Sequence, residues 1–125
     1  MKNKFYILII YLFVNSIASA ENIFIESENI ILDKNKEISI FEKNVVVTTQ
    51  DKKQIKSEYL KYNKKLGLLI LKDNVVAIDS QNNSVETENA EYFENKEIFI
   101  SNGPTKIITT EEYQIDGSDI IFDSI

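Results

Sequence analysis

The sequence repeats itself with a period of about 30 residues, and this period limits the possible folds more than any other feature. A shift of the chain by one period needs no gap and places apolar residues on apolar residues. A unit of this length is a supersecondary element that buries its apolar face only by stacking on its neighbours. The aligned apolar columns are Ile25, Ile55, Val85 and Ile115; Ile30, Leu60, Ala90 and Ile120; Leu32, Tyr62, Tyr92 and Phe122; Ile38, Leu68 and Ile98; Ile40, Ile70 and Ile100; and Val47, Ala77 and Ile107.

Within each unit, Ile-rich and Val-rich stretches alternate with polar residues, which is typical of β-strands. Long segments with the helical period of 3.6 residues are missing after residue 21. With one Pro and three Gly in the chain, the strands are expected to be long. We predict an all-β domain of repeated hairpins, with turns at the polar clusters of residues 33–36, 49–53, 63–65, 79–83 and 94–96.

The apolar positions also change parity inside the strands, at the same place in each unit. One change lies near residues 58–59, between Ser57 and Leu60, and a second is expected near residues 43–44. A strand cannot exchange its faces without a bulge or a corner. We therefore predict that every strand bends at the same column, so that the stack forms a β-jellyroll trough with two facing walls.

The apolar columns predict which side chains line the inside of this trough. They fit two uses, which the sequence leaves open: an ordinary filled core, or the wall of a binding site for an apolar ligand. Lys, Glu and Asn are expected on the outside. The predicted lining consists of Ile25, Ile30, Leu32, Ile38, Ile40, Val47, Ile55, Leu60, Tyr62, Leu68, Ile70, Val85, Tyr92, Ile98, Ile100 and Ile115.

The amino terminus has the pattern of a secretory signal peptide. Lys2 and Lys4 form a basic head, residues 5–14 are apolar, and small residues occupy positions 18 and 20. The apolar stretch is shorter than the roughly 20 residues that span a bilayer, which argues against a retained anchor. We predict a signal peptide at residues 1–20, cleaved before Glu21, and a β-domain at residues 21–125. The product would be exported, in a bacterium with two membranes to the periplasm.

The composition excludes most classes of enzyme and nucleic-acid ligand. The chain has no His and no Cys, and so lacks the usual general base near neutral pH, the thiol nucleophile and the commonest transition-metal ligands. All 14 cations are Lys; without the predicted signal peptide, 12 cations face 20 acids, a net charge of −8. An acidic chain without Arg is a poor partner for nucleic acid. We predict no catalytic residue, no cofactor, no metal site and no nucleic-acid partner.

Two consecutive stretches resemble a known family: residues 54–63 (QIKSEYLKYN) and residues 67–76 (GLLILKDNVV). They are similar to the repeat of the OstA-like domains of the lipopolysaccharide transport system. In that repeat an apolar residue, a small residue and an acid lead to an aromatic residue, a turn and an apolar strand ending in Gly-Asn-Val. The resemblance extends over about residues 23–123, although Lys43 and Asp73 stand where the family favours Gly.

This resemblance implies a trough that shields lipid acyl chains while lipopolysaccharide crosses the periplasm. The family includes an anchored inner-membrane protein, a soluble bridge protein and the amino-terminal domain of the outer-membrane assembly protein. The predicted signal peptide disfavours the first, and residues 103–109 (GPTKIIT) resemble the variant of the last. In that case the chain would be a fragment whose membrane barrel is missing. The alternative is an exported structural or adhesin-like β-repeat protein with a filled core and no lipid ligand.

The first and last strands, expected at residues 23–32 and 113–122, should be the edges of the stack. Unpaired backbone groups along such edges invite the addition of another strand. The predicted partners are therefore lipopolysaccharide inside the trough and other OstA-like proteins at its edges. Head-to-tail oligomers are also expected, and a proline at Ile120 should weaken them.

Overall fold

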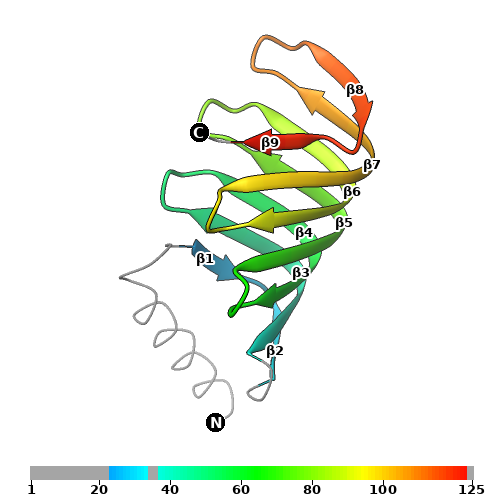
Figure 1. The fold of residues 1–125 in the computed structure, drawn as a ribbon. Helices are drawn as coiled ribbons and strands as arrows, with labels where there is room; N and C mark the ends of the chain where they lie inside the picture. The colour runs from blue at the N-terminus through cyan, green and yellow to red at the C-terminus, as the bar shows by residue number, and fades with distance from the viewer. Residues whose placement is uncertain (1–22, 34–36, 124–125) are drawn as a thin grey trace.

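A computed structural model describes residues 23–33 and 37–123, which form one antiparallel sheet of nine strands (Figure 1). The sheet order is β1-β3-β4-β5-β6-β7-β8, with β2 beside β3 and β9 beside β7. The predicted all-β fold is confirmed, while the predicted signal peptide lies outside the described residues. The strands are β1 (Ile23–Glu26), β2 (Asn29–Asp33), β3 (Ile38–Thr49), β4 (Gln54–Asn63), β5 (Leu68–Ile78), β6 (Ser84–Phe93), β7 (Ile98–Ile108), β8 (Gln114–Ser118) and β9 (Ile121–Asp123).

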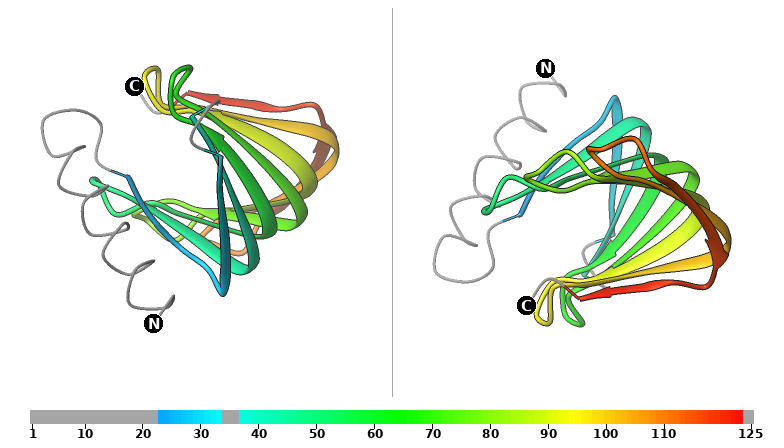
Figure 2. Two further views of the ribbon diagram at one scale, coloured as in Figure 1. Left: turned by 90° about the horizontal axis from the view of Figure 1, so that it is seen from below. Right: turned by 90° about the horizontal axis from the view of Figure 1, so that it is seen from above.

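The sheet is folded along its middle into an open trough, which Figure 2 shows from both ends. Each long strand crosses the fold, so its two halves belong to two walls that meet at a crease. The β1 wall contains β1, β8 and residues 45–49, 54–57, 75–78, 84–87 and 105–108. The β2 wall contains β2, β9 and residues 38–42, 59–63, 68–72, 89–93 and 98–102. Within the described ranges, no helix is long and apolar enough to cross a membrane.

Paired residues with left-handed backbone conformation make the crease in β3 and β5. Lys43 and Asn44 have φ of 70° and 53°, and Asp73 and Asn74 have φ of 69° and 56°. The register with the neighbouring strands shifts at these positions. In β7 the same place holds Gly103, with a φ of 89°. A bulge bends its strand and increases the local twist, so the predicted bend at this column is confirmed.

The strands between these bulges carry a hydroxyl at the crease. The side chains of Ser27 and Ser57 each donate a hydrogen bond to the carbonyl two residues further on, at 2.8 and 3.0 Å, and Thr87 donates to the carbonyl of Pro104 at 3.1 Å. These bonds satisfy backbone acceptors where the chain turns the corner and the ladder is interrupted. The repeated Ser and Thr column therefore has a structural role.

The turns at the lip of the β1 wall, which is the edge of that wall farthest from the crease, repeat with the same period. The backbone N–H of Thr49, Asp79 and Thr109 donates to the carbonyl four residues later, at 2.9, 3.0 and 2.9 Å. The residue before that carbonyl has positive φ in each turn, at Lys52, Asn82 and Glu112. The sequence repeat therefore corresponds to a repeated turn conformation.

The register of the hairpins corrects six of the predicted inward positions. Residues paired across an antiparallel sheet point to the same face, and Leu60 pairs with Phe41 and Leu71 while Tyr62 pairs with Leu69. The strand residues between these inward side chains therefore point outward. The prediction that they line the trough was wrong for Ile38, Ile40, Leu68, Ile70, Ile98 and Ile100.

The physical reason is that these segments are apolar on both faces. Leu68, Leu69, Ile70 and Leu71 follow one another without a polar residue, so alternation cannot choose the inward face. The hairpin register chooses it instead. The predicted change of parity near residues 43–44 was wrong, since Phe41 and Val45 both face inward. The partner strand β4 does change parity, between Ser57 and Leu60, and the extra residue of the bulge in β3 cancels this change.

Candidate functional site

Each wall contributes one mainly apolar row to the inner face of the trough, on the side of the crease residues that lies nearer the lip. Because paired residues share a face, the ladder register defines these rows directly. On the β1 wall the row is Ile25, Val47, Ile55, Ala77, Val85, Ile107 and Ile115. On the β2 wall it is Leu32, Ser39, Tyr62, Leu69, Tyr92, Phe99 and Phe122.

The two rows separate toward the C-terminal end and leave a cavity of about 380 Å³ between them. This volume lies in the range of roughly 300–1,000 Å³ that is common for small-molecule sites. Its apolar lining comes from both walls, with aromatic rings on one side and aliphatic side chains on the other. These residues are Ile55, Ala77, Val85 and Ile107 on the β1 wall and Tyr92, Phe99 and Phe122 on the β2 wall.

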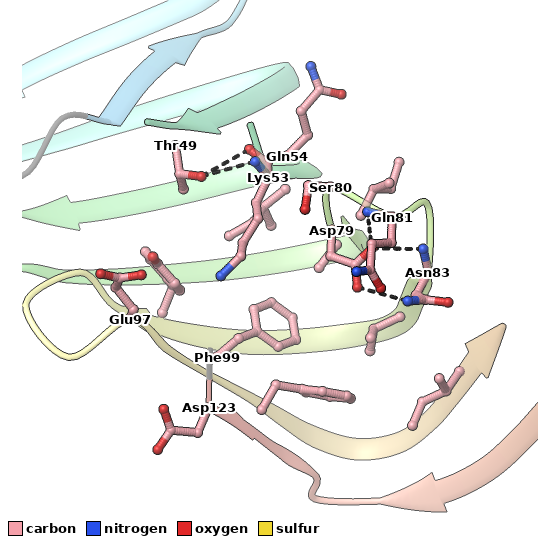
Figure 3. Close-up of a pocket in the computed structure, with 17 residues that line it drawn as sticks. Thr49, Lys53, Gln54, Asp79, Ser80, Gln81, Asn83, Glu97, Phe99 and Asp123 are labelled. Atoms are coloured by element: carbon pink, nitrogen blue, oxygen red, sulfur yellow. Dashed lines mark hydrogen bonds between the residues drawn. The ribbon is translucent and has the colours of Figure 1, made fainter. Parts of the chain in front are cut away.

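Polar side chains surround the mouth of this cavity (Figure 3). Asp79 accepts hydrogen bonds from the backbone N–H groups of Gln81 and Asn83, both at 2.9 Å, and from the Asn83 amide at 3.0 Å. Partial burial raises the pKa of Asp79, but these hydrogen bonds outweigh it and hold the pKa below its usual value. Lys53, Glu97 and Asp123 complete the rim. The site therefore has an apolar floor and a charged opening.

Tyr62 lies on the same inner row but has another role. Its hydroxyl donates a 2.6 Å hydrogen bond to Oε1 of Glu94, and both side chains are buried. Burial, together with the Glu94 carboxylate, raises the pKa of Tyr62 far above its ordinary value, so the phenol stays protonated. Glu94 also donates its backbone N–H to the carbonyl of Gly67, at 3.0 Å. Through these two hydrogen bonds, Glu94 links its own turn to Tyr62 and to the turn that contains Gly67, at the lip of the β2 wall.

The predicted lining residues thus fall into distinct places. Ile55, Val85 and Tyr92 line the cavity. Val47, Leu60 and Tyr62 face inward within the packed part of the trough, where little or none of each side chain is exposed. At the two ends of the inner face lie Ile25, Ile30, Leu32 and Ile115, and on the outer face lie Ile38, Ile40, Leu68, Ile70, Ile98 and Ile100.

Among the residues of the two inner rows that line the cavity, the sequence prediction missed four: Ala77, Phe99, Ile107 and Phe122. Three of them stand in apolar columns of the repeat, so a signal was present for Ala77, Ile107 and Phe122. Phe99 pairs directly with Tyr92 across the hairpin that turns at residues 94–97. Counting residues back from that turn would have placed its ring inside the trough.

The inner row of the β1 wall is much more exposed on the last strand than on the first. Val47 is 0% exposed and Ile25, on the first strand, 7%, whereas Ile115 in the same row is 50% exposed. All residues of β8 are exposed. On the β1 wall the inner row is therefore buried at its first strand and exposed at its last.

No protein-family model and no curated protein sequence matches the chain. Its structure is similar to the crystal structure of LptH, described as the LptA homologous periplasmic component of the conserved lipopolysaccharide transport device from Pseudomonas aeruginosa. The TM-score is 0.71 and the sequence identity 14%, over 82% of this chain and 76% of that chain. The chain thus has the β-jellyroll fold of LptA-like proteins, as an open sheet.

Proposed function

We propose that this protein takes part in lipopolysaccharide transport, by shielding lipid acyl chains inside its trough during passage through the periplasm. The observation that carries the proposal is the apolar cavity between the two walls, in a fold shared with a named periplasmic component of such a device. The process moves the lipid without chemical change, so it needs no catalytic residue, metal or cofactor.

The physical basis is the unfavourable exposure of acyl chains to water. Each methylene that leaves water is worth roughly 0.8 kcal/mol, so a lipid with several chains needs an apolar cover. The rings of Tyr92 and Phe99 face the aliphatic side chains of Val85 and Ile107 across the cavity. Acyl chains would lie between them, while the polar head of the lipid would stay at the rim formed by Lys53, Asp79 and Glu97.

We further propose that an OstA-like partner adds a strand to β8 and extends the trough. The inner apolar row ends there at the half-exposed Ile115. A strand paired with β8 would cover this residue and continue the row, whereas the first strand already has its inner side chains buried. Either role in the periplasm, as a soluble bridge protein or as a domain of an outer-membrane protein, uses this edge.

The alternative is a structural repeat protein without a lipid ligand. The tight packing around Val45, Leu60 and Leu71 would serve it equally well, since those side chains are fully buried. A structural protein does not need the cavity next to Phe99 and Phe122. Lipid contact at the cavity is therefore the decisive measurement.

The neighbours Tyr92 and Phe93 offer a matched test of lipid contact. Tyr92 faces the cavity, while Phe93 pairs with Leu68 and Ile98 on the outer face of the same strand. Each is replaced in turn by a photo-crosslinking phenylalanine in cells that make lipopolysaccharide. We expect a lipid adduct at Tyr92 and none at Phe93. Equal labelling at both positions, or none at Tyr92, would contradict the proposal.

The proposed edge contact requires a different proline from the one expected from the sequence. The N–H of Ile120 donates to Ser101 Oγ at 2.9 Å, inside the fold, so proline there would damage the protein itself. Along an antiparallel strand, every second residue bonds to the same neighbour. Because Tyr113 bonds to Thr109, the residue directly after β7, the backbone groups of Asp116, an odd number of residues further on, point away from β7 toward the free edge. We expect Asp116→Pro to reduce concentration-dependent oligomers in light scattering with an unchanged melting temperature. Unchanged oligomers would contradict pairing at this edge.

A further inference from the structure

The outer face of the β2 wall carries an apolar surface of its own. One row across the sheet consists of isoleucines interrupted at two positions: Ile31, Ile40, Lys61, Ile70, Glu91, Ile100 and Ile121. The next row toward the lip adds Ile38, Leu68, Phe93 and Ile98. Ile31 is 52% and Ile121 65% exposed. Contiguous apolar surface of this kind is typical of interaction sites.

The outer face of the β1 wall differs, although the same strands form it. Its corresponding row is charged at most positions and contains two valines. Such a row is an ordinary solvated sheet face. In the row next to the lip, the β1 wall has only Phe24, Ile78 and Ile108 as apolar residues, on non-adjacent strands, so its outer face lacks an apolar surface like that of the β2 wall. The charged row is Glu26, Val46, Lys56, Val76, Glu86, Lys106 and Asp116.

The isoleucine row of the β2 wall is symmetric about its centre, Ile70. Isoleucines stand at equal distances on both sides, and the two charged positions carry opposite signs, Lys61 on β4 and Glu91 on β6. These two residues are separated by a strand, and at about 4.8 Å per strand spacing their backbones lie roughly 10 Å apart. Lys61 and Glu91 therefore flank Ile70 on its two sides.

We propose that this surface binds a second copy of the same chain, back to back, with a two-fold axis parallel to β5. This axis reverses the order of the strands between the copies, so Lys61 lies opposite Glu91 of the second copy, and Ile40 opposite Ile100 of the second copy. Ile70 faces its own equivalent on the axis. An axis across the strands would instead oppose Lys61 to Lys61, so the charges select the first arrangement.

The arrangement is also reasonable for the geometry of sheets. Figure 2 shows that each wall runs nearly straight from crease to lip, and two sheets packed face to face align their strands within about 30°. A two-fold contact is closed and uses one patch twice. The two troughs would open in opposite directions, with β8 and the cavity free in both copies. The dimer is therefore independent of lipid binding and of the edge contact.

Charge reversal distinguishes a contact between two copies from a purely structural role of Lys61 and Glu91 within one chain. K61E puts Glu opposite Glu91, and E91K puts Lys opposite Lys61, so each variant alone should dimerise about tenfold or more weakly. In an equimolar mixture the two variants complement each other at both contacts and should form a heterodimer. The double variant K61E/E91K restores the pattern within one chain and should dimerise like the original.

The measurement is sedimentation velocity over a concentration series, on protein purified from the periplasm of the expression host. All variants carry Asp116→Pro, which removes association through β8. The matched controls are the single reversals K56E and E86K on either side of Val76 on the outer face of the β1 wall, each of which should leave the dimer unchanged. A monomer at all concentrations, single variants that dimerise normally, or a mixture that stays monomeric would each overturn the proposal.

Discussion

The packed and the open sections of the trough are built from the same columns of the repeat. In the packed section, around β3 to β5, Val47, Leu60, Leu71 and Val75 are fully buried. One period later, around β5 to β7, the same columns hold the smaller or more polar Ala77, Ala90, Ser101 and Thr105. The chain bends at the same column in both sections, but the smaller Ala77 lines the cavity where Val47 is packed.

Side-chain volume, rather than topology, therefore decides whether a unit of this fold is core or cavity. In the open section hydroxyls replace apolar packing at the crease: Thr105 donates to Ser101 Oγ at 2.7 Å. Ser101 in turn accepts the N–H of Ile120, between β8 and β9. Polar bonds therefore hold the last strands where the packed section uses apolar contact.

The largest expected effect is the loss of a side chain from the packed section. Leu60 lies between Phe41 and Leu71 and has no exposed surface. Leu60→Ala should lower the free energy of unfolding by about 2–5 kcal/mol, measured by urea denaturation. Ile107→Ala, at the partly exposed wall of the cavity, should cost about 1 kcal/mol. Equal losses at the two positions would contradict the division into sections.

Enlarging a side chain should have opposite consequences in the two sections. Val47→Phe overfills a packed position and should destabilise the fold by about 1–3 kcal/mol. Ala77→Phe, one period later, should be tolerated because its ring can occupy the cavity. It should also lower lipid crosslinking at Tyr92. A strongly destabilised Ala77→Phe variant would mean that the cavity is not available space.

The hydroxyl groups of the open section should contribute more to the free energy of unfolding than those of the packed section. Ser101→Ala leaves the N–H of Ile120 without this acceptor and should cost about 1–3 kcal/mol. Ser57→Ala, which removes a hydrogen bond to the carbonyl of Tyr59, should cost about 0.5–1.5 kcal/mol. Hydrogen exchange should reveal faster opening of β9 in the first variant alone. Equally slow exchange of β9 in both variants would argue against the anchoring role of Ser101.

The smallest expected effect concerns the acid at the rim of the cavity. The pKa of Asp79 is lowered in the folded protein, so its carboxylate stabilises the fold above the ordinary pKa of about 3.9, and this stabilisation is lost as the pH falls through the lower folded value. Asp79→Asn should therefore cost about 0.5 kcal/mol at pH 7 and less below about pH 4. The equivalent Thr109→Ala should have no such pH dependence, as thermal melts at both pH values would reveal.

Much of the fold could be predicted from the sequence because it depends on local and periodic signals. The column of Ser and Thr, the polar turns and the residues near Lys43 and Asn44 each recur with the period, and each has a local structural cause. The candidate site was predicted only in part. Ile55, Val85 and Tyr92, which were predicted to line the trough, also line the cavity, whereas Phe99 was missed.

The sequence by itself determined the repeat, the strands, the turns and the column of the crease, since these follow from alternation, from turn chemistry and from strict periodicity. Only the tertiary structure decided which face of residues 68–71 and 98–101 is inside, because apolar side chains occupy both faces there and the register of the neighbouring strand makes the choice. It also decided where the trough is filled, since that depends on the summed volume of side chains from both walls. Ala77 on the β1 wall and Phe99 on the β2 wall line the same cavity only because the fold brings the two walls together.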